Sequence, residues 1–129
     1  MLELRDVCLV LGDGEQQVSA LDHVSLDVAA GELLAVVGPS GSGKSSLLAV
    51  IGGLRRPTSG QVRVGGTELT GLAPEALTAV RRERIGFVFQ QSNLVPSLTA
   101  LDQLLLIPHL RGRRPVAADR DRARALLRD

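Results

Sequence analysis

The sequence has 129 residues, and 44% of them are apolar, which predicts a folded protein with its own core. The formal net charge is only +1, so the charge balance does not favour nucleic-acid binding. The arginine clusters at 81–84 and 111–114 are interpreted as solvated faces. Cys8 is the only cysteine, which excludes an intramolecular disulfide and a metal cluster of several thiolates. No apolar run approaches the roughly 18 residues of a membrane span. Charged residues near the first methionine argue against a signal peptide, so a cytoplasmic chain is expected.

The first 28 residues are typical of an antiparallel β-hairpin. Residues 2–11 have strand character, Gly12-Asp13-Gly14 has the composition of a tight turn, and the return strand is expected over about 17–28. Cys8 is interpreted as a small buried hydrophobe of the first strand. The second half of the return strand alternates apolar and polar side chains, which is the period of a half-buried strand: Val24, Leu26 and Val28 against Ser25 and Asp27.

Residues 38–45, Gly-Pro-Ser-Gly-Ser-Gly-Lys-Ser, fit the phosphate-binding pattern G-x-x-x-x-G-K-[ST], also called Walker A. The apolar stretch 32–37 before them predicts a buried strand, and a helix is expected from Lys44 to about Gly52-Gly53. Strand, glycine-rich loop and helix are the context that this motif requires. Glycines let backbone N–H groups turn toward a phosphate chain, and the helix N-terminus adds unpaired donors and positive potential.

Within this loop, Lys44 is expected to reach the terminal phosphates, and the Ser45 hydroxyl is expected to ligate Mg²⁺. The alternative is a glycine-rich turn with a chance lysine. Lys44 is the only lysine of the chain, whose other fourteen basic residues are all arginines. A compact point charge kept at this one position favours the phosphate role.

The elements after the first helix are shorter. Residues 57–60 predict a turn, 61–64 an exposed-edge strand, and Gly65-Gly66 its end. Pro74 suits the first turn of a short helix running to about Arg84.

A second buried strand is expected over 85–89, followed by Gln90-Gln91 and a polar loop. The last two helices are expected to begin at Thr99, a good N-cap with Asp102 three residues on, and at Pro115. The first of them is expected to end at Pro108, and the second has one apolar side, made by Val116, Ala123, Leu126 and Leu127.

The order of these motifs resembles the first half of the ATPase domain of ATP-binding-cassette (ABC) transporters. The resemblance rests on the hairpin, the phosphate loop, the Leu-Arg-Arg-Pro-Thr-Ser-Gly segment at 54–60 and Arg-Ile-Gly-Phe-Val-Phe-Gln-Gln at 84–91. Residues 86–104 are most similar to the macrolide-exporter and lipoprotein-release group. The phosphate loop alone would also admit kinases, GTPases and helicases, so the other motifs give the resemblance its specificity.

The resemblance implies an α/β fold of the P-loop NTPase class, of which this chain forms the N-terminal portion. Residues 1–90 would form the nucleotide-binding core with its β subdomain, in which 2–28 and 61–66 make an antiparallel sheet, and 91–129 would begin the helical subdomain. ATP and Mg²⁺ are the implied cofactors. The implied ATP ligands are Gly38, Pro39, Ser40, Gly41, Ser42, Gly43, Lys44 and Ser45, with a hydroxyl contact from Ser46.

By the same resemblance, Lys44 and Gln90 would be the catalytic residues of this portion. Gln90 would coordinate Mg²⁺ with Ser45 and couple hydrolysis to membrane-spanning subunits. The whole protein would be an ATP-binding transporter subunit, peripheral at the cytoplasmic face of the membrane and not inserted in it, that pairs with a second ATPase domain. It would drive export or lipid-linked transfer.

The chain also departs from the family pattern. Leu11 stands where an aromatic residue usually stacks on adenine, which predicts weaker ATP affinity or a weaker preference for adenine. The Leu-Ser-Gly-Gly-Gln signature and the acidic strand motif are absent from these 129 residues. Thr58-Ser59-Gly60-Gln61 is interpreted as a turn and not as that signature. His23 and His109 are interpreted as structural or exposed residues and not as the family's switch histidine.

Neither Glu32 nor Glu83 has motif support as the base that activates water. Two alternatives therefore stay open beside the ATPase: a truncated, non-catalytic nucleotide-binding or dimerisation fragment, and a different phosphate-loop enzyme such as a small kinase. Taken alone, the polypeptide is predicted to be marginally stable and to show no appreciable ATPase activity.

Overall fold

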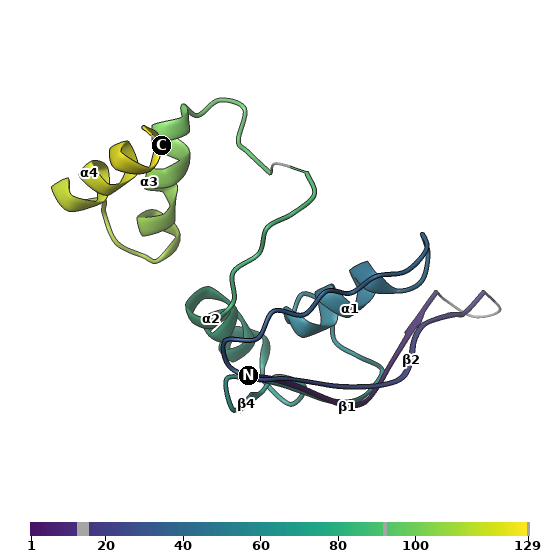
Figure 1. The fold of residues 1–129 in the computed structure, drawn as a ribbon. Helices are drawn as coiled ribbons and strands as arrows, with labels where there is room; N and C mark the ends of the chain where they lie inside the picture. Colours follow the sequence, from purple (N-terminus) through teal and green to yellow (C-terminus); the bar gives the residue numbers. More distant parts are fainter. Residues whose placement is uncertain (13–15, 92, 129) are drawn as a thin grey trace. The chain divides into compact units, whose positions relative to one another are not determined.

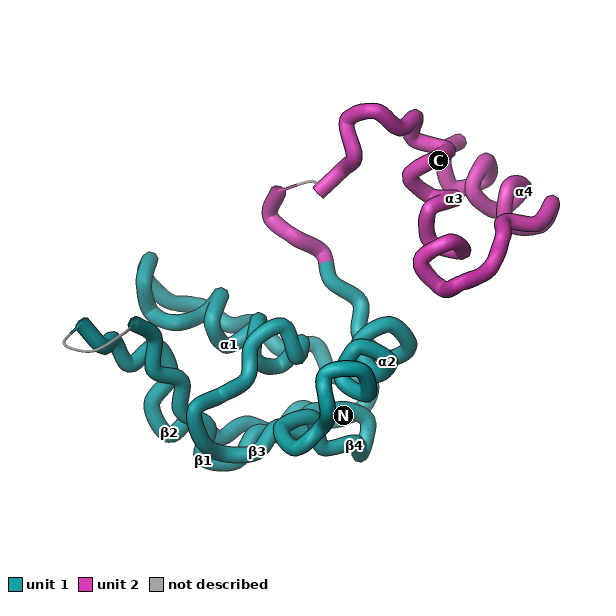
Figure 2. The backbone as a smooth tube through the Cα atoms, turned by 180° about the vertical axis from the view of Figure 1, so that it is seen from behind, with its two compact units in different colours: residues 1–87 teal, residues 88–129 magenta. Residues whose placement is uncertain are grey.

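The computed structural model describes residues 1–12, 16–91 and 93–128. The chain forms two compact units, residues 1–87 and 88–129, and each is described by itself (Figures 1 and 2). No helix in the described part of the chain is long and apolar enough to cross a membrane.

An antiparallel sheet of four strands organises the first unit. Its strands are β1 (Leu2–Leu11), β2 (Val18–Val28), β3 (Ser59–Val64) and β4 (Thr67–Glu68), in the order β2-β1-β3-β4. The predicted hairpin is confirmed, including the alternation of half-buried and exposed residues along 24–28. Asp13 and Gly14 of the predicted turn lie outside the described residues.

The third strand corrects two expectations. Ser59, Gly60 and Gln61 belong to β3, so the segment interpreted as a turn already pairs with β1. The unexpected β4 pairs with the other side of β3 at Arg63 and Val64. Strand β3 is therefore interior to the sheet and not an exposed edge, and its Val62 is almost completely buried.

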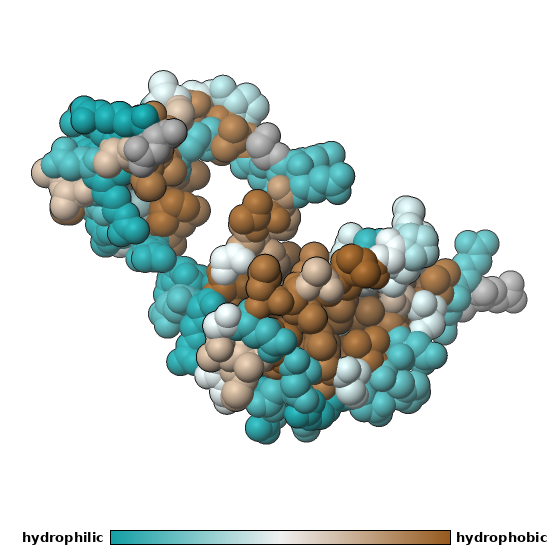
Figure 3. Space-filling model, in the orientation of Figure 1, coloured by the Kyte–Doolittle hydropathy of each residue, from teal (hydrophilic) through white to brown (hydrophobic). Residues whose placement is uncertain are grey.

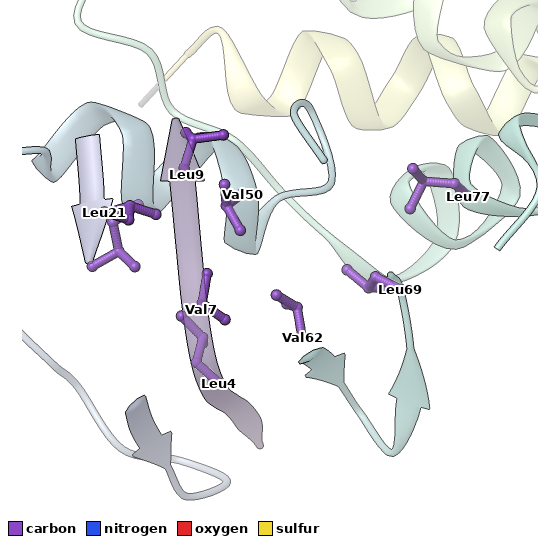
Figure 4. Close-up of a cluster of buried hydrophobic side chains, with 9 residues drawn as sticks. Leu4, Val7, Leu9, Leu21, Val50, Val62, Leu69 and Leu77 are labelled. Carbon is purple, nitrogen blue, oxygen red and sulfur yellow. The ribbon is translucent and has the colours of Figure 1, made fainter. Parts of the chain in front are cut away.

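The core lies between the sheet and the helices α1 (Lys44–Ile51) and α2 (Pro74–Arg84). The two helices contribute Leu47, Val50 and Leu77 to the core cluster. Figure 4 shows Val50 and Leu77 with side chains of the sheet. This core is aliphatic, in keeping with a sequence that has no Trp or Tyr and only two Phe residues. The sheet residues of this cluster are Leu4, Val7, Leu9, Leu21 and Val62, with Leu69 after β4.

Two segments predicted as buried strands, 32–37 and 85–89, form no strand. Leu33 and Val37 are 96% and 87% exposed, and Val88 is fully exposed. A strand needs a hydrogen-bonded neighbour, and none of the described strands pairs with either segment. Apolar side chains consequently gather at the surface (Figure 3).

Part of the second segment does pack. Ile85 is half-buried against the core cluster, and the Phe87 ring lies over Gly52, where an added Cβ would fall 1.8 Å from the ring carbon Cζ.

The second unit contains α3 (Ala100–Leu110) and α4 (Ala117–Leu126). The Thr99 cap is confirmed, because its hydroxyl accepts from the Asp102 N–H at 3.2 Å and donates to the Asp102 carboxylate at 2.6 Å. The expected end at Pro108 is wrong. Pro108 weakens the helix but does not end it. The helix runs two residues further and closes through the Arg111 N–H, which donates to the carbonyls of Ile107 and Pro108.

Helix α4 begins two residues later than expected, at Ala117. The Asp119 carboxylate accepts from the Val116 N–H at 2.9 Å and from both terminal nitrogens of Arg113 at 2.6 and 2.8 Å. These hydrogen bonds, with that from Arg113 the largest cause, hold the pKa of Asp119 well below its usual range.

Candidate nucleotide-binding site

The phosphate-binding loop leads directly into α1. Gly41 and Gly43 adopt left-handed φ angles of +82° and +85°, which L side chains rarely adopt. Between them, the Ser42 N–H donates to the Pro39 carbonyl at 3.3 Å and closes a tight turn. The glycines predicted from the motif are thus required by the backbone itself.

The hairpin fixes the position of the loop. An added Cβ at Gly43 would lie 2.4 Å from the Ala20 carbonyl oxygen of β2, and 3.5 Å from a Leu21 methyl group. Leu47 and Val50 then anchor α1 in the core. Sequence reasoning did not identify Ala20, because a contact between residues 23 positions apart leaves no local pattern.

The N-terminus of α1 is suited to an anion. Gly43 is the N-cap residue and supplies no side-chain hydrogen bond, and the first turn of the helix contains no acidic residue. The first N–H groups of an α-helix have no acceptor within the helix, and the helix dipole makes this end positive. A phosphate group would accept hydrogen bonds from these N–H groups and would be attracted by the positive end of the helix.

Lys44 places its ammonium group over the loop. Its Nζ donates to the carbonyls of Gly38 at 2.9 Å and Pro39 at 2.6 Å, with the Ser42 hydroxyl at 3.4 Å. The charge therefore already lies beside the loop, held by the loop's own carbonyls. An ammonium has only three hydrogens, so binding a phosphate requires the lysine to exchange or share these contacts.

The two serines after the lysine lie in the first turn of α1. Ser45 is exposed and Ser46 is half-buried. A hydroxyl oxygen at Ser45 is a hard donor of the kind that Mg²⁺ prefers, so the residue fits a metal held jointly with phosphate oxygens. Ser40, the remaining loop residue of the prediction, is exposed.

The other residues weighed from the sequence lie in different settings. Gln90 belongs to the second unit and is exposed there, so its role stays a prediction. Glu32 accepts from the Ala29 N–H at 2.7 Å, and Glu83 lies on α2 with Arg82 at 3.9 Å. Leu11 is half-buried against the core and pairs with Val18.

A family model described as ABC transporter matches residues 21–129. Over 98% of its length the chain is 41% identical to the uncharacterized ABC transporter ATP-binding protein MJ0796 of Methanocaldococcus jannaschii. It is 44% identical, over the same share, to an uncharacterized ABC transporter ATP-binding protein of Thermotoga maritima, and it spans 54% of each of these relatives. Its identity to the macrolide export ATP-binding/permease protein MacB of Hyphomonas neptunium is 42%, again over 98% of the chain but only 20% of the relative.

A solved structure of MJ0796, described as a dimeric post-hydrolysis state of the ATP-binding cassette bound to ADP and Pi, superposes with a TM-score of 0.89 at 40% identity. The match covers 99% of this chain and 56% of that one. The predicted fold class is confirmed, and the chain spans about half the length of these ATP-binding relatives. The chain therefore belongs to the ABC transporter family, within its ATP-binding domain.

Proposed function

We propose that this chain provides the phosphate-binding portion of an ABC-type ATPase domain and binds ATP through residues 38–46. One observation supports this most directly: left-handed Gly41 and Gly43 lead into an uncapped helix N-terminus while the Lys44 ammonium lies over the same loop. The ADP and Pi named for the MJ0796 structure belong to the same chemical class as the ATP of this proposal.

Within this proposal each residue has a separate task. The loop N–H groups orient the phosphate chain, and Lys44 neutralises charge on its outer phosphates. Ser45 would hold Mg²⁺, and the part of Gln90 in holding it stays a prediction. When bound, that ion neutralises charge on the β- and γ-phosphate oxygens. Ser46 would add a hydroxyl contact.

The transporter role is proposed from the relatives. The chain would act as an ATP-binding subunit that pairs with a second ATPase domain and couples ATP binding and hydrolysis to export or lipid-linked transfer through membrane-spanning subunits. The dimeric state in the MJ0796 description and the combined ATP-binding and permease name of MacB support these two kinds of partner. The location would be the cytoplasmic face of the membrane.

The test is ATP affinity, measured by displacement of a fluorescent nucleotide in the presence of Mg²⁺. Lys44→Ala should weaken ATP binding about tenfold or more, because hydrogen bonds to charged groups contribute about 1.5–3 kcal/mol. Arg124→Ala is the matched control, since it also removes one exposed positive charge but lies in α4 of the second unit. Equal ATP affinity in wild type and Lys44→Ala would contradict the proposal.

The exposed segment 32–37 favours a second candidate function. An apolar, exposed segment that leads into the phosphate loop can add to the sheet of another polypeptide, because its backbone N–H and C=O groups can pair there. In this case the chain would bind nucleotide without hydrolysing it and would associate with a partner through 32–37. ATP turnover by the 129-residue polypeptide that disappears in Lys44→Ala would exclude this second function.

A further inference from the structure

The hairpin carries a second cluster of reactive side chains, which the proposed nucleotide site does not use. Cys8 of β1 faces Asp22 and His23 of β2, and one donor atom from each residue lies within 4.8 Å of the other two. The donors are a thiol sulfur, an imidazole nitrogen and a carboxylate oxygen. Cys8 is half-buried, whereas the other two side chains are exposed, so the cluster opens to solvent.

A fourth side chain, Asp6, orients the imidazole. Its Oδ1 lies 2.6 Å from His23 Nδ1, and this hydrogen bond is the main reason that the pKa of His23 is raised. With the Nδ1 hydrogen donated to Asp6, Nε2 is the nitrogen left for another ligand, and it lies 3.8 Å from Asp22 Oδ1. Metal-binding histidines characteristically donate their second N–H to a carboxylate in this way.

The backbone holds the cluster together through irregular pairing. The register of β1 with β2 shifts between Leu4 and Val7 and again between Val7 and Leu9. Asp6 and His23 both take left-handed φ angles, of 52° and 49°. The His23 N–H then donates to Cys8 Sγ at 3.3 Å, which links the two strands at the sulfur and remains compatible with a metal-bound thiolate.

We propose that Cys8, Asp22 and His23 bind a transition-metal ion of the Zn²⁺ class, with Asp6 as the positioning residue of the imidazole. Thiolate, imidazole and carboxylate together suit Zn²⁺, whereas Mg²⁺ and Ca²⁺ prefer oxygen ligands alone. Metal–ligand bonds of about 2.0–2.3 Å place tetrahedral ligand atoms about 3.5 Å apart. Side-chain rotations that move the ligand atoms by about an ångström would therefore bring all three within bonding distance of one ion.

Binding would release the thiol proton, and any proton on Nε2, to solvent without transfer of electrons, and water would take the fourth position. The ion would tie β1 to β2, the strand whose Ala20 carbonyl contacts the phosphate loop at Gly43. Since the metal binds the folded state, it would also stabilise the hairpin by mass action.

The experiment measures Zn²⁺ affinity by chelator competition, and Co²⁺ absorption as a report of a metal–thiolate bond, on the untagged chain without nucleotide. Wild type should bind one ion with thiolate charge-transfer absorption. Cys8→Ser should lose this absorption and bind Zn²⁺ at least about tenfold more weakly, and His23→Asn should bind comparably weakly. Asp6→Asn should weaken binding about tenfold while the Cys8 absorption is kept, because Asp6 acts only through the ring.

His109→Asn is the matched control, since it removes the only other histidine, on α3, and should leave Zn²⁺ affinity unchanged. Circular dichroism checks that each variant is folded. Asp22→Asn, at an exposed position, gives a further variant with little risk to folding, and it should also weaken binding. Absence of stoichiometric binding, or Zn²⁺ affinity unaffected by Cys8→Ser and Asp22→Asn, would overturn the proposal.

Discussion

At the scale of the single residue, Gly60 shows how one position is fixed by contact with another strand. Its φ angle is +89°, and an added Cβ would lie 2.4 Å from the Asp6 carbonyl oxygen and 2.6 Å from the Val7 Cα atom. Both neighbours are backbone atoms of β1 and cannot rotate away. Gly60→Ala should therefore lower the free energy of unfolding by about 2–4 kcal/mol, from left-handed strain and overpacking together.

Gly66→Ala is the control for this prediction. Gly66 has a similar φ angle of +79°, but nothing lies within 4 Å of its added Cβ, so only the backbone cost of about 1–2 kcal/mol is expected. Urea unfolding of the two variants measures the difference. Equal losses of stability would show that the contact between Gly60 and β1 is not the cause.

The candidate nucleotide site was largely predictable from the sequence at this scale. Left-handed glycines, a lysine and a following helix are local requirements, so a motif of eight residues contains them. The contact of Gly43 with Ala20, and the Gly38 and Pro39 carbonyls around the Lys44 ammonium, were not predictable. They depend on how the loop folds back on itself and on a strand more than twenty residues away.

At the scale of the element, local signals predicted the hairpin, α1, α2 and the Thr99 cap. The failures have a common cause. Segments 32–37 and 85–89 have the apolar composition of buried strands, but strand formation needs a partner that composition cannot supply. The reverse holds for β4, whose two residues have no strand pattern and pair because Gly65-Gly66 turns the chain back on β3.

The start of α4 should be sensitive to acid. The folded-state pKa of Asp119 is lowered, mainly by its hydrogen bonds to Arg113 and secondly by that to the Val116 N–H. The stabilisation is therefore complete above the carboxyl's ordinary pKa of about 3.9, and is lost as the pH falls below that value through the folded-state pKa. Amide exchange at Val116 and along the first turn of α4 should accelerate, relative to an unstructured reference, over this acidic range.

Asp119→Asn should remove this acid dependence and give faster exchange already at neutral pH. Asp121→Asn is the control, since the Asp121 carboxylate is exposed and lies 3.7 Å from Arg124 on the same helix. Acid sensitivity of the Val116 amide that persists in Asp119→Asn would assign the effect to another carboxylate.

At the scale of the whole molecule, the segment 32–37 leads into the candidate phosphate loop but pairs with none of the described strands. Leu33 and Val37 expose most of their side chains immediately before the loop. Large exposed apolar patches mark sites of association or of aggregation. The chain spans about half the length of the ATP-binding relatives that it matches.

The 129-residue polypeptide should consequently bind ATP without appreciable turnover. In the proposed site, loop N–H groups and Lys44 would stabilise phosphate charge, but hydrolysis also requires a positioned water, and that requires a base or an orienting group beside it. Glu32 is engaged by the Ala29 N–H, and Glu83 lies on α2 beside Arg82. Steady-state phosphate release should match that of Lys44→Ala, whereas ATP affinity should differ between the two. Turnover by the wild-type polypeptide that disappears in Lys44→Ala would show that these residues suffice for hydrolysis, and would exclude the non-catalytic alternative.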